Sequence, residues 1–312
     1  MKAIIGHSDI INSFYKIIEG ERFSHAHIFY GEDGIGKSIV ARKLAIKIIG
    51  KSEFKDYVDI VQFKIKESKN SIGVNDIRGL IDEINKKPYE AMKKVVIIHN
   101  GDKMTIQAQN ALLKTIEEPP KDIFIFILCE NILKILDTIK SRCQIHKLKA
   151  LSNDEIVEYF QDRYPEINDD YLEIITKFSR GIPGVGEKLI NDETFKEIRD
   201  KSIELLVTIK NMNVNEILKK DEEFSKYIKD FDVMIDIIIS FVRDTILYKE
   251  TGNIEIVINK DKVSDIKECA NIFSFKQLND IISIINDARD NITLNANNSL
   301  TFSVMLLKMQ EV

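Results

Sequence analysis

The sequence predicts an α/β domain built on a parallel sheet, followed by a small helical segment and an all-helical C-terminal part. Apolar, strand-like runs alternate with helical patterns through the first half, which is typical of a parallel sheet wrapped by helices. A glycine-rich phosphate-binding motif follows the first of these strands. Strand patterns almost vanish after Lys149, and apolar residues at helical spacing replace them.

Four strands and three helices are expected in the first half. The expected strands, of which the last two are rich in Val, Ile and Phe and should be buried on both faces, are Ala26–Tyr30, Ile60–Ile65, Lys94–His99 and Ile123–Cys129. The helices expected between them are Lys37–Ile49, Val74–Lys86 and Thr105–Glu118. The third helix ends at Pro119 because proline cannot continue a helix.

The rest of the chain is expected to be helical. Ser152 and Glu155 form a capping box that begins a helix reaching about Arg163, and the next helix ends at Gly181. Apolar stripes in the last third indicate the inner faces of a helical bundle, while Glu250–Val263 predicts a loop or a short strand. We expect a nucleotide-binding-like domain over residues 1–148, a helical lid over 149–203 and a helical C-terminal domain over 204–312.

Composition and charge limit the function classes. A net charge of -5 argues against a protein that binds nucleic acid by itself, because phosphate neutralisation needs a clustered basic surface. Cys129, Cys143 and Cys269 are far apart and indicate neither a disulfide framework nor a zinc knuckle. The first residues lack the apolar core of a signal peptide, and no stretch approaches the ~20 apolar residues of a membrane span. We expect a cytoplasmic protein with no membrane partner.

The motif G-x-x-x-x-G-K-S follows a predicted strand and begins a predicted helix. Gly31, Gly34 and Gly36 allow backbone N–H groups to turn inward around phosphates. Lys37 can reach the terminal phosphates and the Ser38 hydroxyl can bind magnesium. The motif predicts binding of ATP or ADP with magnesium, and a retained loop that only shapes the turn is the alternative.

The acids that should accompany this loop are missing. The strand that begins at Lys94 should end in one carboxylate for magnesium and another that polarises water. His99 and Asn100 stand there instead. Neutral imidazole is a poor ligand for a hard cation, and loss of a general base removes about 10²–10⁴-fold of rate. Asp102 is open to two interpretations, a displaced acid or a solvated turn residue, and the turn is favoured.

Three motifs carry a resemblance to a known family. They are the run Ser24–Gly31 (S-H-A-H-I-F-Y-G), the string Asn110–Pro120 (N-A-L-L-K-T-I-E-E-P-P) and Ser141-Arg142-Cys143. With these motifs the chain resembles bacterial clamp-loader subunits of the AAA+ class over roughly Ile5–Leu189. The C-terminal helices match in character only. The resemblance implies a P-loop AAA+ domain with flanking helices, a small helical lid and an all-α collar for oligomerisation.

The resemblance also implies roles and partners. Arg142 matches an arginine finger, which acts in trans on the nucleotide of the adjacent subunit; such a finger contributes about 10³–10⁵ in rate. Without the resemblance, Arg142 would be interpreted as a surface ion-pairing residue. The implied partners are the gamma/tau motor and delta subunits of the loader, and, through the complex, the sliding clamp and primed DNA.

Departures from the family pattern weaken the expected catalysis. Gly184 holds the place of a lid arginine that senses the terminal phosphate in motor subunits. The polar sensor after the fourth strand falls at Cys129 or Glu130, and Glu130 would repel phosphate. Relatives often carry a four-cysteine zinc module, whereas Lys51–Val58 is short and has no cysteine. We expect no bound zinc.

The leading hypothesis is a weakly hydrolysing or non-hydrolysing subunit of a pentameric loader that places the sliding clamp on primed DNA. It would offer Arg142 to the adjacent motor subunit and contain no polymerase active site. One alternative is an active ATPase motor subunit of the same loader. The other is a free-standing P-loop phosphotransferase, which would need a substrate acid or base near the strand ends.

Overall fold

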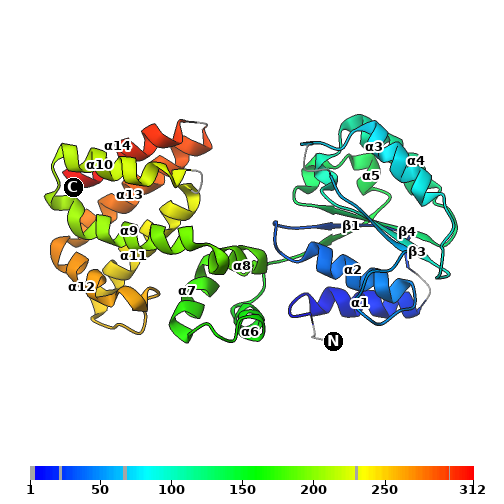
Figure 1. Ribbon diagram of the computed structural model, residues 1–312, viewed down its shortest axis with the longest axis horizontal. Helices are drawn as coiled ribbons and strands as arrows, with labels where there is room; N and C mark the ends of the chain where they lie inside the picture. Colours follow the sequence, from blue (N-terminus) through cyan, green and yellow to red (C-terminus); the bar gives the residue numbers. More distant parts are fainter. Residues whose placement is uncertain (1–3, 21–22, 66–68, 229–230, 295) are drawn as a thin grey trace. The chain divides into compact units, whose positions relative to one another are not determined.

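The computed structural model describes residues 4–20, 23–65, 69–228, 231–294 and 296–312. Met1, Lys2 and Ala3, which begin the stretch considered for a signal peptide, lie outside the described residues. Contacts divide the chain into two compact units (Figure 1): unit 1 contains 1–165 and 179–186, and unit 2 contains 166–178 and 187–312. The division into domains at 148 and 203 stays a prediction.

Unit 1 contains a five-stranded parallel sheet with the strand order β2-β3-β4-β1-β5. The strands are β1 (Ala26–Tyr30), β2 (Ile60–Phe63), β3 (Lys94–Ile98), β4 (Ile123–Cys129) and β5 (Gln144–Lys147). The predicted α/β class is confirmed. The four predicted strands are present, although β2 ends two residues and β3 one residue earlier than expected.

Helices cover both faces of the sheet (Figure 1). They are α1 (Ser8–Glu19), α2 (Lys37–Ile48), α3 (Val74–Ile84), α4 (Ile106–Glu117) and α5 (Asp137–Lys140). Alternate residues of β3 face opposite cores: Val95 and Ile97 pack with α1 and α2, whereas Val96 and Ile98 pack with α3, α4 and α5. Burial on both faces explains why this strand is a continuous apolar run.

Helices follow in the remainder of the chain. They are α6 (Asn153–Arg163), α7 (Asp169–Ser179), α8 (Pro183–Asn191), α9 (Glu193–Thr208), α10 (Val214–Ser225), α11 (Phe231–Thr251), α12 (Val263–Ile272), α13 (Phe275–Thr293) and α14 (Asn298–Glu311). The predicted capping box is confirmed, since the Ser152 hydroxyl accepts from the Glu155 N–H and the Glu155 carboxylate from the Ser152 N–H. Of the two alternatives for 250–263, the loop is right: after α11 comes irregular chain and the short 3₁₀ helix η5 (Lys260–Lys262).

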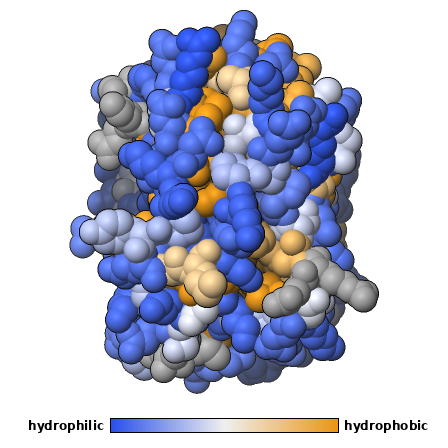
Figure 2. Space-filling view, turned by 90° about the vertical axis from the view of Figure 1, so that its right-hand side faces the viewer, coloured by the Kyte–Doolittle hydropathy of each residue, from blue (hydrophilic) through white to orange (hydrophobic). Residues whose placement is uncertain are grey.

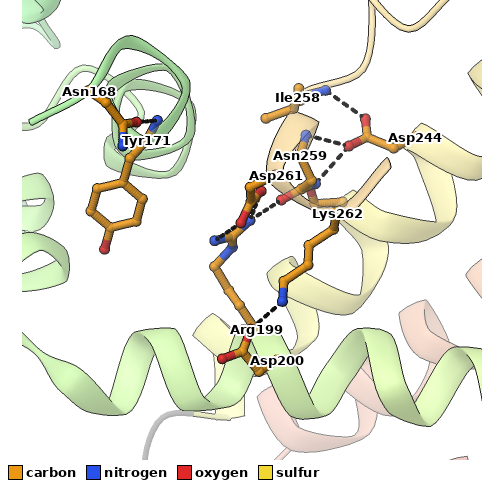
Figure 3. A network of polar contacts seen from close by, with 10 residues as sticks. Asn168, Tyr171, Arg199, Asp200, Asp244, Ile258, Asn259, Asp261 and Lys262 are labelled. Atoms are coloured by element: carbon orange, nitrogen blue, oxygen red, sulfur yellow. Dashed lines mark hydrogen bonds and ion pairs between the residues drawn. The ribbon is translucent and has the colours of Figure 1, made fainter. Parts of the chain in front are cut away.

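A buried polar network fixes this loop within unit 2 (Figure 3). Arg199 of α9 makes two hydrogen bonds to the Asp261 carboxylate, at 2.8 and 3.1 Å, and a third to Asn259 Oδ1 at 3.0 Å. Asn259 Nδ2 in turn donates to Asp244 of α11 at 2.7 Å. Only 3% of Arg199 is exposed, so its charge depends on Asp261 for compensation. The network joins α9 and α11 through Asn259 and through Asp261 of the short 3₁₀ helix η5.

The surface in Figure 2 is mainly hydrophilic, with hydrophobic residues in small patches. In the part of the chain that the structure describes, no helix combines the length and the apolar character that crossing a membrane requires.

Candidate functional site

The phosphate-binding loop connects β1 to α2 at the carboxyl edge of the sheet, as the motif predicts. Gly34 and Gly36 have φ values of 78° and 102°, which side-chain-bearing residues rarely adopt. The backbone N–H groups of Ile39 and Val40 both donate to the Gly36 carbonyl oxygen, so α2 begins directly at the end of the loop. The motif therefore forms a tight strand–loop–helix turn.

The Lys37 ammonium lies on the loop itself. Its Nζ donates to the carbonyl oxygens of Gly31 and Glu32, both at 2.8 Å. Burial lowers the pKa of Lys37, and the negative charges of Glu130 and Asp33 oppose that shift. In this arrangement the loop's own carbonyl oxygens, rather than phosphate oxygens, accept the hydrogen bonds of Lys37.

The Ser38 hydroxyl, the predicted magnesium ligand, lies 3.4 Å from His99 Nδ1. On the other side of the ring, His99 Nε2 donates to Gln62 Oε1 at 3.1 Å, which leaves Nδ1 as the acceptor. Burial, with help from the charge of Lys64, lowers the pKa of His99 to about 4, so the ring is neutral at pH 7. The corner that should hold a carboxylate–magnesium pair thus contains a neutral imidazole.

A cavity of about 290 Å³ lies beside this corner. It is lined by Asp33, Lys37, Ser38, Lys64, Ile65, His99, Asn100, Leu128, Cys129 and Glu130. At the expected sensor position, burial raises the pKa of Cys129 to about 12, and Glu130 is exposed. The structure therefore brings Lys37, Ser38, His99 and the sensor position together.

Asp102 lies in the 3₁₀ turn η1 (Gly101–Lys103), with its carboxylate 3.4 Å from the Glu130 N–H and 3.5 Å from the Asn131 N–H. This arrangement fits the interpretation of Asp102 as a turn residue. Among the described residues, His, Cys, Asp and Glu side chains form no group of three or more that suits a metal ion. The expectation of no zinc stays a prediction.

Gly184 lies against the phosphate-binding loop, a contact that sequence reasoning missed. Its N–H donates to the Gly34 carbonyl oxygen at 3.0 Å. A Cβ on Gly184 would lie only 2.6 Å from the Gly34 Cα. No side chain fits at 184 in this arrangement, so the first turn of α8 covers the loop with bare backbone. In the sequence, the only signal at this position is the glycine pair Gly181 and Gly184 around Pro183, which does not indicate a contact with Gly34.

Arg142 lies in the turn that follows α5 and does not line the cavity beside Ser38, as far as the described residues show. Its Nη1 donates to the Thr138 carbonyl oxygen at 3.0 Å and to Ser141 Oγ at 3.2 Å. Its Nε pairs with the Glu117 carboxylate at 2.8 Å. About 41% of the Arg142 side chain is exposed, so the guanidinium can reach a group outside the chain.

Two family models match the chain, and both are described as DNA polymerase III, delta subunit. One matches residues 6–152, and the other, for the C-terminal part, matches residues 193–311. The chain belongs to this DNA polymerase III delta-subunit family. Family membership confirms the resemblance to clamp-loader subunits that the motifs indicated.

Individual proteins are similar to this chain over nearly its whole length. The chain is 25% identical to DNA polymerase III subunit delta' of Bacillus subtilis, over 97% of this chain and 95% of the relative. It is also 25% identical to the tau subunit of that organism, over 98% of this chain and 60% of the relative. A solved DNA polymerase III gamma-subunit-related protein of Thermotoga maritima is 22% identical, with a TM-score of 0.49 over 96% of this chain and 98% of that protein.

Proposed function

We propose that this chain is the delta-prime subunit of a bacterial DNA polymerase III clamp loader and helps to load the sliding clamp onto primed DNA. The match to a delta' subunit over nearly the whole length of both chains supports the subunit type. The observation that carries the proposal is the contact between Ser38 and His99, because it separates this chain from an ATPase motor.

The chain itself hydrolyses little or no ATP. A hydrolysing P-loop site needs carboxylates for magnesium and for the attacking water, and Ser38 here faces a neutral imidazole. Lys37 is held by carbonyl groups of its own loop, and Gly34 is covered by Gly184. In this arrangement the residues fit magnesium and nucleotide phosphates poorly, so the loop serves as a structural joint at the carboxyl edge of the sheet.

The catalytic contribution of the chain is Arg142, offered as an arginine finger to the nucleotide of the adjacent motor subunit. Its exposed guanidinium and its fixed backbone turn support this role. A guanidinium aimed at phosphoryl oxygens stabilises the charge of the transition state. The partners are the motor and delta subunits of the loader, with clamp and DNA reached through the complex, in the cytoplasm.

An active motor subunit is a second candidate, which the match to tau and the complete loop motif favour. ATP turnover by the purified chain separates the two candidates. We expect no appreciable hydrolysis with magnesium present, and turnover at rates of order 1 s⁻¹, within the usual range for enzymes, would establish the motor instead.

The finger role has its own test. In a clamp loader reconstituted with its other subunits, Arg142→Ala should lower the clamp- and DNA-stimulated ATPase that depends on the adjacent site by about 10³–10⁵-fold. Hydrolysis at the other motor sites would hide the loss at the adjacent site, so ATP turnover is best measured with those other sites inactivated. An unchanged rate at the adjacent site would exclude Arg142 as the finger.

A further inference from the structure

Glu117, the last residue of α4, forms an ion pair with Arg142, in which its Oε1 lies 2.8 Å from Arg142 Nε. We infer that Glu117 is a positioning residue that fixes the Arg142 guanidinium for action on a neighbouring subunit. The inference rests on the proposed function, because it needs Arg142 to be the finger. Glu117 belongs to the sequence string that carries the family resemblance, where the sequence alone gave it no role.

The donors of Arg142 divide into two sets. A guanidinium has five N–H donors in a planar fork. Nη1 donates to Thr138 and Ser141, and Nε lies in the ion pair with Glu117. Within the described residues Nη2 has no acceptor, so its two N–H groups are available to an acceptor from another chain. The two hydrogen bonds and the ion pair restrain the guanidinium while Nη2 stays available.

The same helix also fixes the backbone that carries Arg142. Gln109 of α4 is 2% exposed, and its Oε1 accepts from the Leu136 N–H at 2.8 Å, directly before α5. Its Nε2 donates to the Lys134 carbonyl oxygen at 2.9 Å. Figure 1 shows α4 beside α5 in unit 1. Gln109 therefore fixes the main chain ahead of the finger, while Glu117 fixes its side chain.

The Glu117 pair acts on orientation more than on stability. Both side chains are about 40% exposed, and exposed ion pairs contribute little to folding. Solvent screens the Glu117 charge, so repulsion of a phosphate at the Nη2 corner is small compared with the advantage of an ordered side chain. Ordering one long side chain in advance corresponds to a rate gain of about two- to twelvefold.

The test uses the reconstituted clamp loader with the adjacent motor site as the reporter. Glu117→Ala should lower kcat at that site by about two- to twelvefold with an unchanged KM. Glu117→Gln keeps a side chain of the same length with an oxygen that can lie beside Nε, but removes the charge of the ion pair, and should recover part of the rate. Glu118→Ala is the matched control, because among the described residues Glu118 makes no side-chain hydrogen bond or ion pair, and it should match the wild-type rate.

A double-mutant cycle distinguishes positioning from general damage. If Glu117 acts through Arg142, Glu117→Ala should cause no further loss in the Arg142→Ala protein. An equal loss in both backgrounds, or a wild-type or faster rate for Glu117→Ala alone, would overturn the inference while leaving the finger intact. A wild-type rate for Arg142→Ala would instead overturn the proposed function, so the two failures are distinguishable.

Discussion

The N–H of Gly184 donates to the carbonyl oxygen of Gly34 at 3.0 Å, which places the first turn of α8 directly on the phosphate-binding loop. The two glycines exclude side chains from each other: a Cβ on Gly34 would lie 3.0 Å from the Gly184 Cα, and a Cβ on Gly184 would lie 2.6 Å from the Gly34 Cα. At the position where the resemblance implies a lid arginine, the packing against Gly34 therefore requires glycine.

Gly184→Ala should destabilise the protein, because the new methyl group meets backbone atoms that cannot rotate away. Overpacking of this kind costs about 1–3 kcal/mol of unfolding free energy, measurable by denaturant unfolding. Gly79→Ala is the matched control: Gly79 lies inside α3 with open space around it, so alanine should stabilise by about 0.5–1 kcal/mol. If both substitutions changed the free energy of unfolding in the same direction, the backbone contact between Gly184 and Gly34 would be contradicted.

Arg199→Ala should destabilise unit 2 by removing the compensation between a buried guanidinium and Asp261. Breaking a buried pair costs about 3–5 kcal/mol, and the lower end applies because 36% of the Asp261 side chain is exposed. Lys262→Ala removes a nearby, partly exposed pair with Asp200 and should cost less than about 1 kcal/mol. Thermal unfolding of the two variants checks the difference; similar midpoints would mean that the buried network contributes little.

The sequence predicted the parts of the fold that local patterns determine. The buried strands β3 and β4 were predictable because burial on both faces demands continuous apolar residues. Strand β5 was not predicted, since Gln144–Lys147 is a largely exposed edge strand with a polar composition. Its place depends on pairing with β1, where Gln144 lies opposite His27, and a single sequence does not reveal such pairing.

The same difference between local and long-range features applies to the candidate site. The loop motif fixed the strand–loop–helix turn, because its glycines meet a local backbone requirement. The closure of Gly34 by Gly184 and the pairing of Arg142 with Glu117 were not predictable, since both join residues far apart in the chain. His99 was predicted as a missing acid, but its contact with Ser38 depends on the spatial adjacency of β3 and α2.

Lys37→Ala should leave the ATPase of the reconstituted clamp loader within about twofold of wild type. Under the proposed function ATP is hydrolysed on other subunits, and this substitution removes no group that acts there. An active P-loop depends on this lysine to bind the terminal phosphates. The same substitution in a motor subunit is the positive control and should abolish hydrolysis at that subunit's site. A comparable loss for Lys37→Ala in this chain would show that its own loop turns over ATP.

His27 and His146 form a buried pair on neighbouring strands. His27 Nε2 donates to the Ser24 carbonyl oxygen at 2.9 Å, so the neutral ring has a bare Nδ1, which accepts from His146 Nε2 at 3.0 Å. His27 is 0% exposed, and burial is the main cause that lowers its pKa to about 3; Phe14 and Phe23 pack against the ring. A proton on Nδ1 would face the N–H of His146.

Folding stability should therefore fall on acidification before most carboxylates titrate. Unfolded His27 binds a proton near pH 6.5, whereas folded His27 stays neutral down to about pH 3, so the stabilisation is complete above pH 6.5 and is lost as the pH falls. The expected slope is about 1.4 kcal/mol per pH unit for this residue. Urea unfolding between pH 7 and 5 should give a shallower slope for His27→Phe, which cannot bind the proton, and parallel curves for both proteins above pH 7. An equal slope below pH 6.5 would assign the acid sensitivity to other groups.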